Sequence, residues 1–273
     1  MGRKRVFLIW DFDAAIGAIN STYPYNFSIE YIYREIENVR KILDLLDLYG
    51  IKSCFAITGF SAETGIYPFN IPDLIREIYE RGHEVASHSW RHEWIPLFDK
   101  KQIEASLRRS KKALESALGI KDSVTGFVPP HSRPMTWLKR GAFSLGDKRH
   151  APFYPMGDFS AVLSLVQKTG YKWARVSHHK IWHKFYDKTN LCGRVIKHNG
   201  ILILENHHVG FDQVVISHIT SSNGGDFIIT AHPAMLLFPD KNENIENLTN
   251  FLDNLSRNVS IQFCTPRELI IAK

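Results

Sequence analysis

The sequence predicts an α/β fold in which seven or eight strand–helix units form a closed or nearly closed (β/α) barrel. Short apolar runs rich in β-branched and aromatic residues alternate along the chain with longer segments of helical periodicity. This alternation indicates a parallel sheet with right-handed crossovers. The 273 residues contain no internal repeat, low-complexity tract or composition break, so we expect one domain over residues 1–273.

Strands and helices can be placed in order along the chain. The first strand, Val6–Asp13, leads into a polar and aromatic loop over residues 14–28, whose length is typical of a binding loop. Further apolar runs predict strands over Ile51–Ile57, His83–Ser87, Val124–Val128, Lys172–Val176, Gly200–Leu204, Phe227–Thr230 and Ser260–Cys264. Apolar stripes at helical spacing predict helices over Ser28–Leu48, Pro72–Arg81, Asp99–Leu118, Thr136–Phe143, Phe159–Thr169 and Asn244–Asn254.

The composition is that of an ordinary globular protein. Hydrophobic residues make up 44% of the chain, and 34 Lys and Arg against 28 Asp and Glu give a net charge of +6. The basic residues of the helix over 99–118 are interspersed with Glu104 and Glu115, which favours a solvated face over a nucleic-acid footprint. We therefore expect no nucleic-acid partner.

Cysteine usage and hydropathy restrict the environment of the protein. Three cysteines, none in a Cys-x-x-Cys pair, argue against a disulfide framework and against a zinc–thiolate site. No stretch approaches the roughly 18 apolar residues that a membrane span needs. The basic start is followed by too short an apolar run for a signal peptide. We expect a cytoplasmic protein with no membrane partner, and the sequence leaves a homo-oligomer open.

The first strand ends in two carboxylates, Asp11 and Asp13. Alternate residues of a strand share a face, so both side chains are expected to point the same way, with Phe12 opposite. The carboxyl ends of parallel strands are where α/β enzymes place their chemistry. The simpler interpretation is that one carboxylate caps the next helix and the other is solvated.

Histidines follow three other strands at the same end of the predicted sheet. His88 and His92 are four residues apart at a strand-to-helix junction, a spacing at which two imidazoles can converge on one metal. One Asp with two His is a donor set for a divalent ion that leaves positions open for water and substrate. His131 follows the strand over 124–128, and His232 ends a late buried strand.

Together these residues resemble the polysaccharide deacetylase family, also called carbohydrate esterase family 4, over essentially the whole chain. Asp11 and Asp13 match the first motif in a separated Asp-x-Asp form, which is similar to the cytoplasmic branch of peptidoglycan deacetylases and cyclic amidases. Residues 88–92, His-Ser-Trp-Arg-His, match the second motif, His-Ser-x-x-His. His232 corresponds to the late histidine of the family's Leu-x-His motif. The resemblance implies a distorted (β/α) barrel of about seven parallel strands.

The third motif, usually Arg-x-Pro-(Pro)-Tyr, departs from the family pattern. Val128 stands where the family has an Arg that pairs with the catalytic Asp, and His131 stands where it has Tyr. Loss of that positive charge would raise the pKa of Asp11. Arg133 and Arg175 are the candidates to supply the charge from another position.

The resemblance also implies a mechanism. Asp13, His88 and His92 hold a divalent transition metal, by preference Zn²⁺, which lowers the pKa of a water molecule and polarises an amide carbonyl. Asp11 acts as the general base, and His232 returns a proton to the leaving amine.

His131 is the third predicted catalytic residue, because its backbone N–H is expected to hold the oxyanion. The implied function is hydrolysis of a non-peptide C–N amide bond, with an N-acetylated carbohydrate or a small amide as substrate. Aromatic residues that could line the groove, each with core packing as the alternative, are Trp90, Trp94, Phe127 and Trp173.

Two other functions fit parts of the sequence. A phosphotransferase of the haloacid-dehalogenase type also begins with an apolar strand that ends in Asp-x-Asp, and it uses Mg²⁺. However, Ala15 stands where that family has Thr or Val, and His88 and His92 stay unexplained. Val128 favours the other function, a catalytically impaired homologue that binds metal or glycans. Phosphatase activity lost on chelation of Mg²⁺ would identify the first, and glycan binding without release of acetate or amine the second.

Overall fold

The computed structural model describes residues 2–21, 28–93, 95, 98–132, 159–176 and 193–271. Its strands are β1 Lys4–Phe12, β2 Cys54–Ile57, β3 Glu84–Ser87, β4 Gly126–Phe127, β5 Trp173–Val176, β6 Arg194–His198, β7 Ile201–Glu205, β8 His208–Val209, β9 Gly225–Ala231 and β10 Ile261–Phe263. Its helices are α1 Ala14–Ser21, α2 Ile29–Leu48, α3 Pro72–Glu80, α4 Lys100–Leu118, α5 Phe159–Lys168, α7 Gln213–Ser221, α8 Ile245–Ser256 and α9 Glu268–Ile271. Short 3₁₀ turns are η1 Gly59–Ala62, η3 Pro130–Ser132 and η4 Pro233–Met235. Within these described ranges, no helix is long and apolar enough to cross a membrane.

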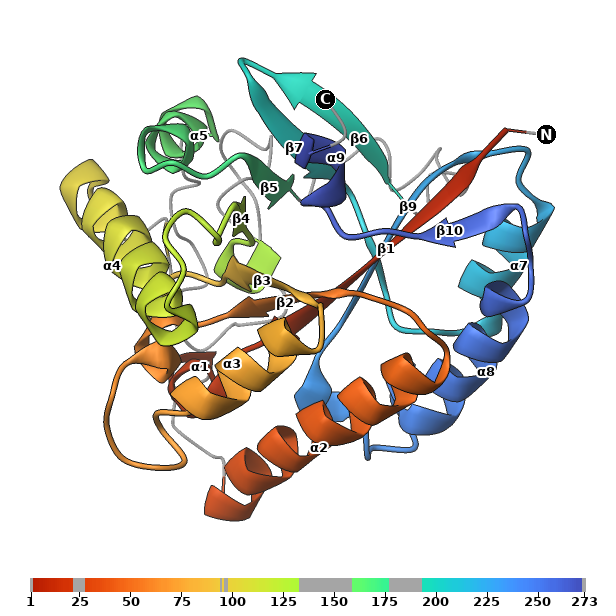
Figure 1. The fold of residues 1–273 in the computed structure, drawn as a ribbon, viewed down its shortest axis with the longest axis horizontal. Coiled ribbons are helices and arrows are strands. Elements are labelled where there is room, and N and C mark those ends of the chain that lie inside the picture. Colours follow the sequence, from red (N-terminus) through yellow and green to blue (C-terminus); the bar gives the residue numbers. More distant parts are fainter. Residues whose placement is uncertain are drawn as a thin grey trace.

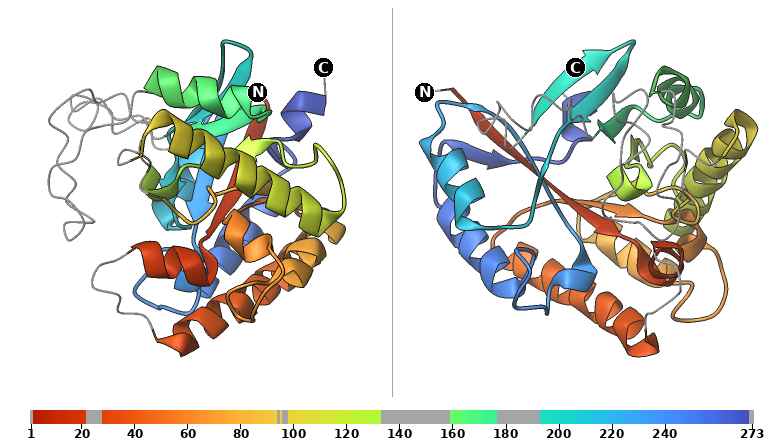
Figure 2. Two further views of the ribbon diagram at one scale, coloured as in Figure 1. Left: turned by 90° about the vertical axis from the view of Figure 1, so that its left-hand side faces the viewer. Right: turned by 180° about the vertical axis from the view of Figure 1, so that it is seen from behind.

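The strands form one sheet in the order β6-β7-β5-β4-β3-β2-β1-β9-β8, and β10 pairs with β1 beside this path. Every strand pair is parallel except β6–β7, which is antiparallel. Figures 1 and 2 show the sheet curled, with β1 running through its middle and the long helices arranged along its outer side. The prediction of a distorted (β/α) barrel is confirmed, and the sheet is a half-barrel in shape.

The two faces of β1 explain how the core is divided. Alternate side chains from Val6 to Phe12 belong to the large cluster between sheet and helices. The intervening Phe7 and Ile9 belong to a smaller cluster on the concave face, where α9 packs against it through Leu269 and Ile270. Continuing the same alternation brings Asp11 to the concave face at the carboxyl end of the strand.

The helix boundaries follow the capping signals in the sequence. Ser28 caps α2 by accepting a hydrogen bond from the Tyr31 backbone N–H, and Asp99 caps α4 in a capping box with Gln102. Gly119 ends α4 in the left-handed conformation, at φ 69°. Both long helices therefore begin and end close to where their patterns predict.

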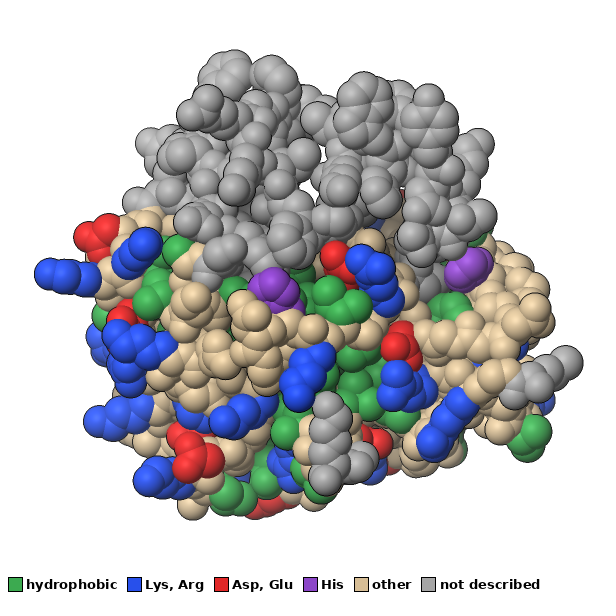
Figure 3. Space-filling model, turned by 90° about the horizontal axis from the view of Figure 1, so that it is seen from above, with side chains coloured by type: hydrophobic (Ala, Val, Ile, Leu, Met, Phe, Trp, Pro, Cys, Tyr) green, Lys and Arg blue, Asp and Glu red, His purple; other side chains and the backbone are tan. Residues whose placement is uncertain are grey.

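Acidic side chains partly compensate the basic residues of α4. The exposed face in Figure 3 shows Lys and Arg side chains scattered, with Asp and Glu among them. Within the described residues, three ion pairs involve basic residues of α4: Arg108–Glu104, Arg109–Glu63 and Lys111–Glu115. This agrees with the solvated face that the mixed charges of the helix predict.

Four elements differ from the sequence prediction. The predicted loop over 14–28 contains α1, and a side chain on Gly17 of that helix would collide with the Asp13 Cβ, 2.5 Å away. The sequence analysis also placed no strand or helix at β6, β8 or α7. The strand β6 pairs with β7 in antiparallel fashion because a tight turn at Asn199 and Gly200 joins the two strands as a hairpin. Both turn residues have positive φ. The predicted helix over 136–143 and loop over 144–158 lie outside the described residues.

Candidate metal centre and active site

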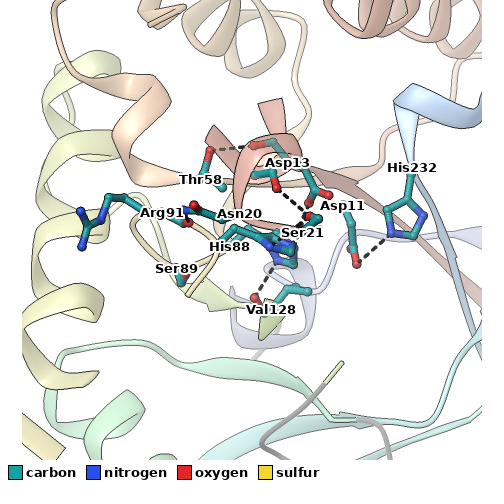
Figure 4. A network of polar contacts seen from close by, with 12 residues as sticks. Asp11, Asp13, Asn20, Ser21, Thr58, His88, Ser89, Arg91, Val128 and His232 are labelled. Atoms are coloured by element: carbon teal, nitrogen blue, oxygen red, sulfur yellow. Dashed lines mark hydrogen bonds and ion pairs between the residues drawn. The ribbon is translucent and has the colours of Figure 1, made fainter. Parts of the chain in front are cut away.

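The site lies at the carboxyl end of β1, where Asp11 and Asp13 leave the sheet on the same side. The intervening Phe12 is wholly buried on the helix-facing side. Figure 4 shows both carboxylates close to His88, with His232 approaching Asp11 from the opposite side. The interpretation of these carboxylates as a cap and a solvated charge is wrong for Asp11, which is only 5% exposed.

Asp13 and two histidines form a compact group of metal-binding type. Asp13 Oδ1 is 3.3 Å from Nε2 of His88 and 3.3 Å from Nε2 of His92. One ligand atom from each residue lies within 4.8 Å of the other two. Burial alone would raise the pKa of Asp13, but the neighbouring imidazoles hold it well below its usual value.

Contacts on the far side of each imidazole orient it. Nδ1 of His88 donates to the carbonyl of Val128 at 2.8 Å, so that its Nε2 carries the lone pair that faces Asp13. Nδ1 of His92 lies 3.4 Å from Oγ of Ser21 at the end of α1. The helix that sequence reasoning missed therefore positions the histidine loop, and its small, uncharged sequence carries no signal of that role.

The loop over residues 88–92 is held in an unusual backbone shape. Ser89 and His92 both have positive φ, 63° and 59°, a region that side chains rarely adopt. Ser110 of α4 donates to the Ser89 carbonyl at 2.9 Å, and the Asn20 amide of α1 donates to the Arg91 carbonyl at 2.5 Å. Two helices thus clamp the loop in the conformation that brings both imidazoles together.

Arg175 supplies the positive charge that Val128 lacks. Its Nη1 donates to Asp11 Oδ1 at 2.7 Å and its Nη2 to Asp11 Oδ2 at 2.5 Å, a two-pronged contact in which the guanidinium is only 1% exposed. The register of β4 and β5 pairs Phe127 with Ala174, so Val128 and Arg175 are the next residues along neighbouring strands. The positive charge therefore comes from β5 instead of the end of β4, and it contacts the same carboxylate, that of Asp11. Arg133, the other candidate, lies outside the described residues.

The Arg175 contact determines the ionisation of Asp11. Burial would raise the pKa of this carboxyl, but the guanidinium, together with His88 and His232, holds it well below its usual range. Thr230 on β9 adds a contact to Asp11 Oδ1 at 3.3 Å and accepts a hydrogen bond from Arg175. Asp11 is therefore ionised at neutral pH in spite of its burial.

His232 lies between two carboxylates. Its Nδ1 is 2.8 Å from Oε2 of Glu243, which also accepts a hydrogen bond from the His232 backbone N–H, and its Nε2 is 4.0 Å from Oδ2 of Asp11. Burial lowers the pKa of the imidazole, but Glu243 outweighs it, with help from Asp11 and Asp13, and the pKa rises to about 10. Sequence reasoning missed Glu243, because nothing in the eleven-residue separation marks it as a partner.

A cavity of about 760 Å³ joins these groups. All six residues selected from the sequence line it, namely Asp11, Asp13, His88, His92, His131 and His232. The ring of His131 meets that of His92 edge-on, with 4.4 Å between centroids. His207, which follows β7, lines the same cavity.

The aromatic residues considered for a substrate groove do not gather here. Phe127 and Trp173 are wholly buried in the core clusters, and the guanidinium groups of Arg91 and Arg109 pack over the ring of Trp90. Trp94 lies outside the described residues. Core packing explains the first two, because Gly126 leaves room for the Trp173 ring where a Cβ would come within 2.1 Å.

Comparisons with known proteins show what the sequence and the fold resemble. The sequence model for polysaccharide deacetylase matches residues 27–146. An uncharacterized 30.6 kDa protein of Geobacillus stearothermophilus is 26% identical over 173 residues, which are 60% of this chain and 52% of that protein. A chitin deacetylase of Pestalotiopsis sp is 26% identical over 113 residues, which are 41% of this chain and 35% of that protein. The chain thus spans about half of the first of these relatives and about a third of the second.

A solved structure from Mycobacterium smegmatis, provisionally assigned as a polysaccharide deacetylase, has the same fold. It superposes with a TM-score of 0.70 at 14% identity and covers 100% of this chain and 91% of its own. Over residues 27–146 the sequence is therefore similar to the polysaccharide deacetylase family, and the fold of the whole chain agrees with that similarity.

Proposed function

We propose that the protein is a metal-dependent amide hydrolase that removes the acetyl group from an N-acetylated carbohydrate. The observation that carries the proposal is the pairing of Asp11 with His232 across 4.0 Å at one wall of the cavity. Their partners give them opposite charges at neutral pH, with a base beside Arg175 and an acid beside Glu243. Hydrolysis of an amide needs both, one to accept a proton from water and one to protonate the amine.

The residues present fit a divalent transition metal, by preference Zn²⁺. Two imidazole nitrogens and one carboxylate oxygen are donors that zinc accepts, and three protein ligands are typical of catalytic sites. Asp13 Oδ1 is buried without a hydrogen-bond donor among the described residues, although both Nε2 atoms face it, which is the arrangement that a shared cation would satisfy. When bound, the metal would supply Lewis-acid chemistry, polarising the amide carbonyl and acidifying water.

The side chains have separate tasks in this mechanism. Asp11 accepts the proton of the attacking water, and Arg175 keeps that carboxylate ionised and oriented until it does so. His232 gives its Nε2 proton to the leaving nitrogen, while Glu243 holds Nδ1 and fixes the ring. The backbone N–H of His131, at the cavity wall, is proposed to stabilise the negative charge that develops on the carbonyl oxygen.

The Arg175 contact also bears on the alternative functions. A catalytically impaired homologue was suggested by Val128, but the base has its guanidinium partner from β5. A phosphatase of the haloacid-dehalogenase type would have no use for His88 and His92, whose Nε2 atoms both face Asp13. Deacetylation uses all of these groups.

Acetate release tests the proposal. Metal-stripped protein, reloaded with Zn²⁺, is incubated with N-acetylated chito-oligosaccharides, and acetate is measured together with the amine formed. We expect release from the wild type, and a loss of about 10²–10⁴-fold in Asp11→Asn with metal still bound. Metal-loaded wild-type protein that binds these sugars but releases neither product would establish the impaired homologue instead.

A further inference from the structure

A second buried carboxyl group, that of Glu35, lies at the same cavity and has no task in the mechanism above. Glu35 belongs to α2, is 1% exposed and lines the cavity together with Asp13 and His232. Its charge interacts with both of these residues. The family motifs in the first strand and in the histidine loop do not include any residue of α2.

Neither carboxyl oxygen of Glu35 has a hydrogen-bond partner among the described residues. Burial of such a group is unfavourable, because its hydration is lost and nothing replaces it. Buried polar groups in folded proteins are nearly always paired, so an unpaired carboxyl at a cavity wall is a candidate for contact with a ligand. Burial, with Asp13 adding to it, also raises the pKa of Glu35 well above its usual value.

The position of α2 beside His232 is fixed by a direct contact. Asn38, one helical turn after Glu35 on the same side of α2, donates from Nδ2 to the carbonyl of Pro233 at 2.9 Å. Pro233 is the residue after His232, so the helix is tied to the segment that carries the proposed acid. Glu35 therefore flanks the half of the cavity in which the leaving nitrogen is protonated.

Another buried glutamate, Glu84, differs from Glu35 in that hydrogen bonds within the protein satisfy its carboxyl group. Glu84, 2% exposed, accepts hydrogen bonds from Nε1 of Trp173 and from the backbone N–H of Arg267, both at 2.8 Å. It borders the interior cluster, away from the metal-binding group. Glu35 is equally buried but lacks any such donor among the described residues, so the packing of the chain does not account for it.

We propose that Glu35 is a specificity-determining residue: its carboxyl group accepts a hydrogen bond from a hydroxyl or N–H group that flanks the leaving nitrogen on the amine half of the substrate. A carboxyl group keeps at least one accepting oxygen in either protonation state, so the contact does not depend on its charge. The inference rests on the proposed function and selects, within it, substrates whose amine half carries a donor next to the acetamido group. A 2-acetamido sugar has such a hydroxyl, whereas a simple N-acetylated alkylamine does not.

The experiment compares two substrates on two proteins. One substrate is an N-acetylated chito-oligosaccharide, and the other is its analogue with hydrogen in place of the hydroxyl that flanks each acetamido group. In the wild type, removal of the hydroxyl is expected to lower kcat/KM for acetate release by roughly 10–100-fold. In Glu35→Leu, kcat/KM for the natural substrate falls by a similar factor, mainly through KM, and the two substrates become equivalent. Glu35→Gln, which keeps one accepting oxygen, retains part of the discrimination.

Thermal unfolding separates this role from a structural one, with Glu84→Leu as the matched control. Glu35→Leu is expected to keep or raise the Tm, by roughly 3–6 °C, because it removes an unpaired buried group. Glu84→Leu, or Glu84→Gln if that variant does not fold, lowers the Tm and leaves the substrate preference unchanged. A fall in Tm for Glu35→Leu, or a wild-type preference preserved in that variant, overturns the role of Glu35 alone. A wild type that releases acetate from neither substrate overturns the proposed function as well.

Discussion

The concave face of the sheet holds a buried carboxylate near each end, and the two have different partners. Glu84, at the start of β3, is bonded by the indole N–H of Trp173 and the backbone N–H of Arg267, which are uncharged donors. Asp11, at the end of β1, is bonded by both arms of the Arg175 guanidinium. Their exposed fractions are similar, 2% and 5%.

Similar burial leads to opposite ionisation. Burial raises the pKa of Glu84 to about 7, and its hydrogen bonds offset only part of that rise. Burial acts in the same direction on Asp11, but the charge of Arg175 reverses the result and holds the pKa well below its usual range. The charge of the partner therefore decides in which direction the pKa of a buried carboxyl group on this face shifts.

The largest expected effect concerns the metal ligands at the carboxyl end. Asp13→Ala and His88→Ala remove a donor and are expected to reduce bound metal from about one ion per chain to nearly none, with acetate release lost by at least about 10³-fold. Elemental analysis after dialysis measures the metal. Glu84→Gln, at the other end, should bind metal as the wild type does. Unchanged metal content in Asp13→Ala would refute the ligand assignment.

The next effect is on stability. Arg175→Met leaves Asp11 buried without its counter-charge, which is expected to lower the free energy of unfolding by about 3–5 kcal/mol. Urea denaturation measures it. Asp11→Asn in the same chain removes the unpaired charge, so the double variant should regain much of the loss. If Arg175→Met cost no more than Glu84→Gln, the proposed difference between the two ends would be wrong.

A smaller effect is expected in the pH dependence of acetate release. Glu243 is the main cause of the raised pKa of His232, so Glu243→Gln lowers that pKa from about 10 toward the ordinary value of 6.5. The acid is then deprotonated at lower pH. The alkaline limb of the pH profile of kcat/KM should therefore shift to lower pH by about 1–3 units, the usual size of charge effects on buried groups. A profile identical to that of the wild type would mean that His232 is not the acid.

The smallest effect concerns the stability contribution of Glu84. This carboxyl ionises at about 7 when folded and near 4.5 when unfolded, so the folded state binds more protons between these values and stability falls as pH rises through them. The wild type should lose about 1–3 kcal/mol relative to Glu84→Gln across this window. Asp11 has the opposite sign: its contribution is present above pH 3.8 and is lost only as the pH falls below that value. Chemical denaturation at pH 4.5 and 7.5 compares the two Glu84 proteins.

Local patterns in the sequence were sufficient to select six of the residues that line the cavity. The strand over Val6–Asp13 alternates between faces, and that alternation alone predicts Asp11 and Asp13 on one side. The His-x3-His spacing, at the end of the next-but-one strand, predicts two converging imidazoles. The carboxyl ends of parallel strands meet at one edge, and this geometric rule brings the ends of β1, β3, β4 and β9 together without knowledge of any contact.

The partners of these residues were decided by tertiary structure. Arg175 is 164 positions from Asp11, and only the register of β4 and β5 shows that it stands beside Val128 and can replace the missing charge. Glu243 and Glu35 reach the cavity from a turn and a helix whose own sequences are unremarkable. Sequence periodicity reports which face a residue occupies, but not which distant segment packs against that face. The sequence therefore predicted which residues lie together at this edge of the sheet, whereas the charges of Asp11 and His232 depend on neighbours that only the folded molecule brings close.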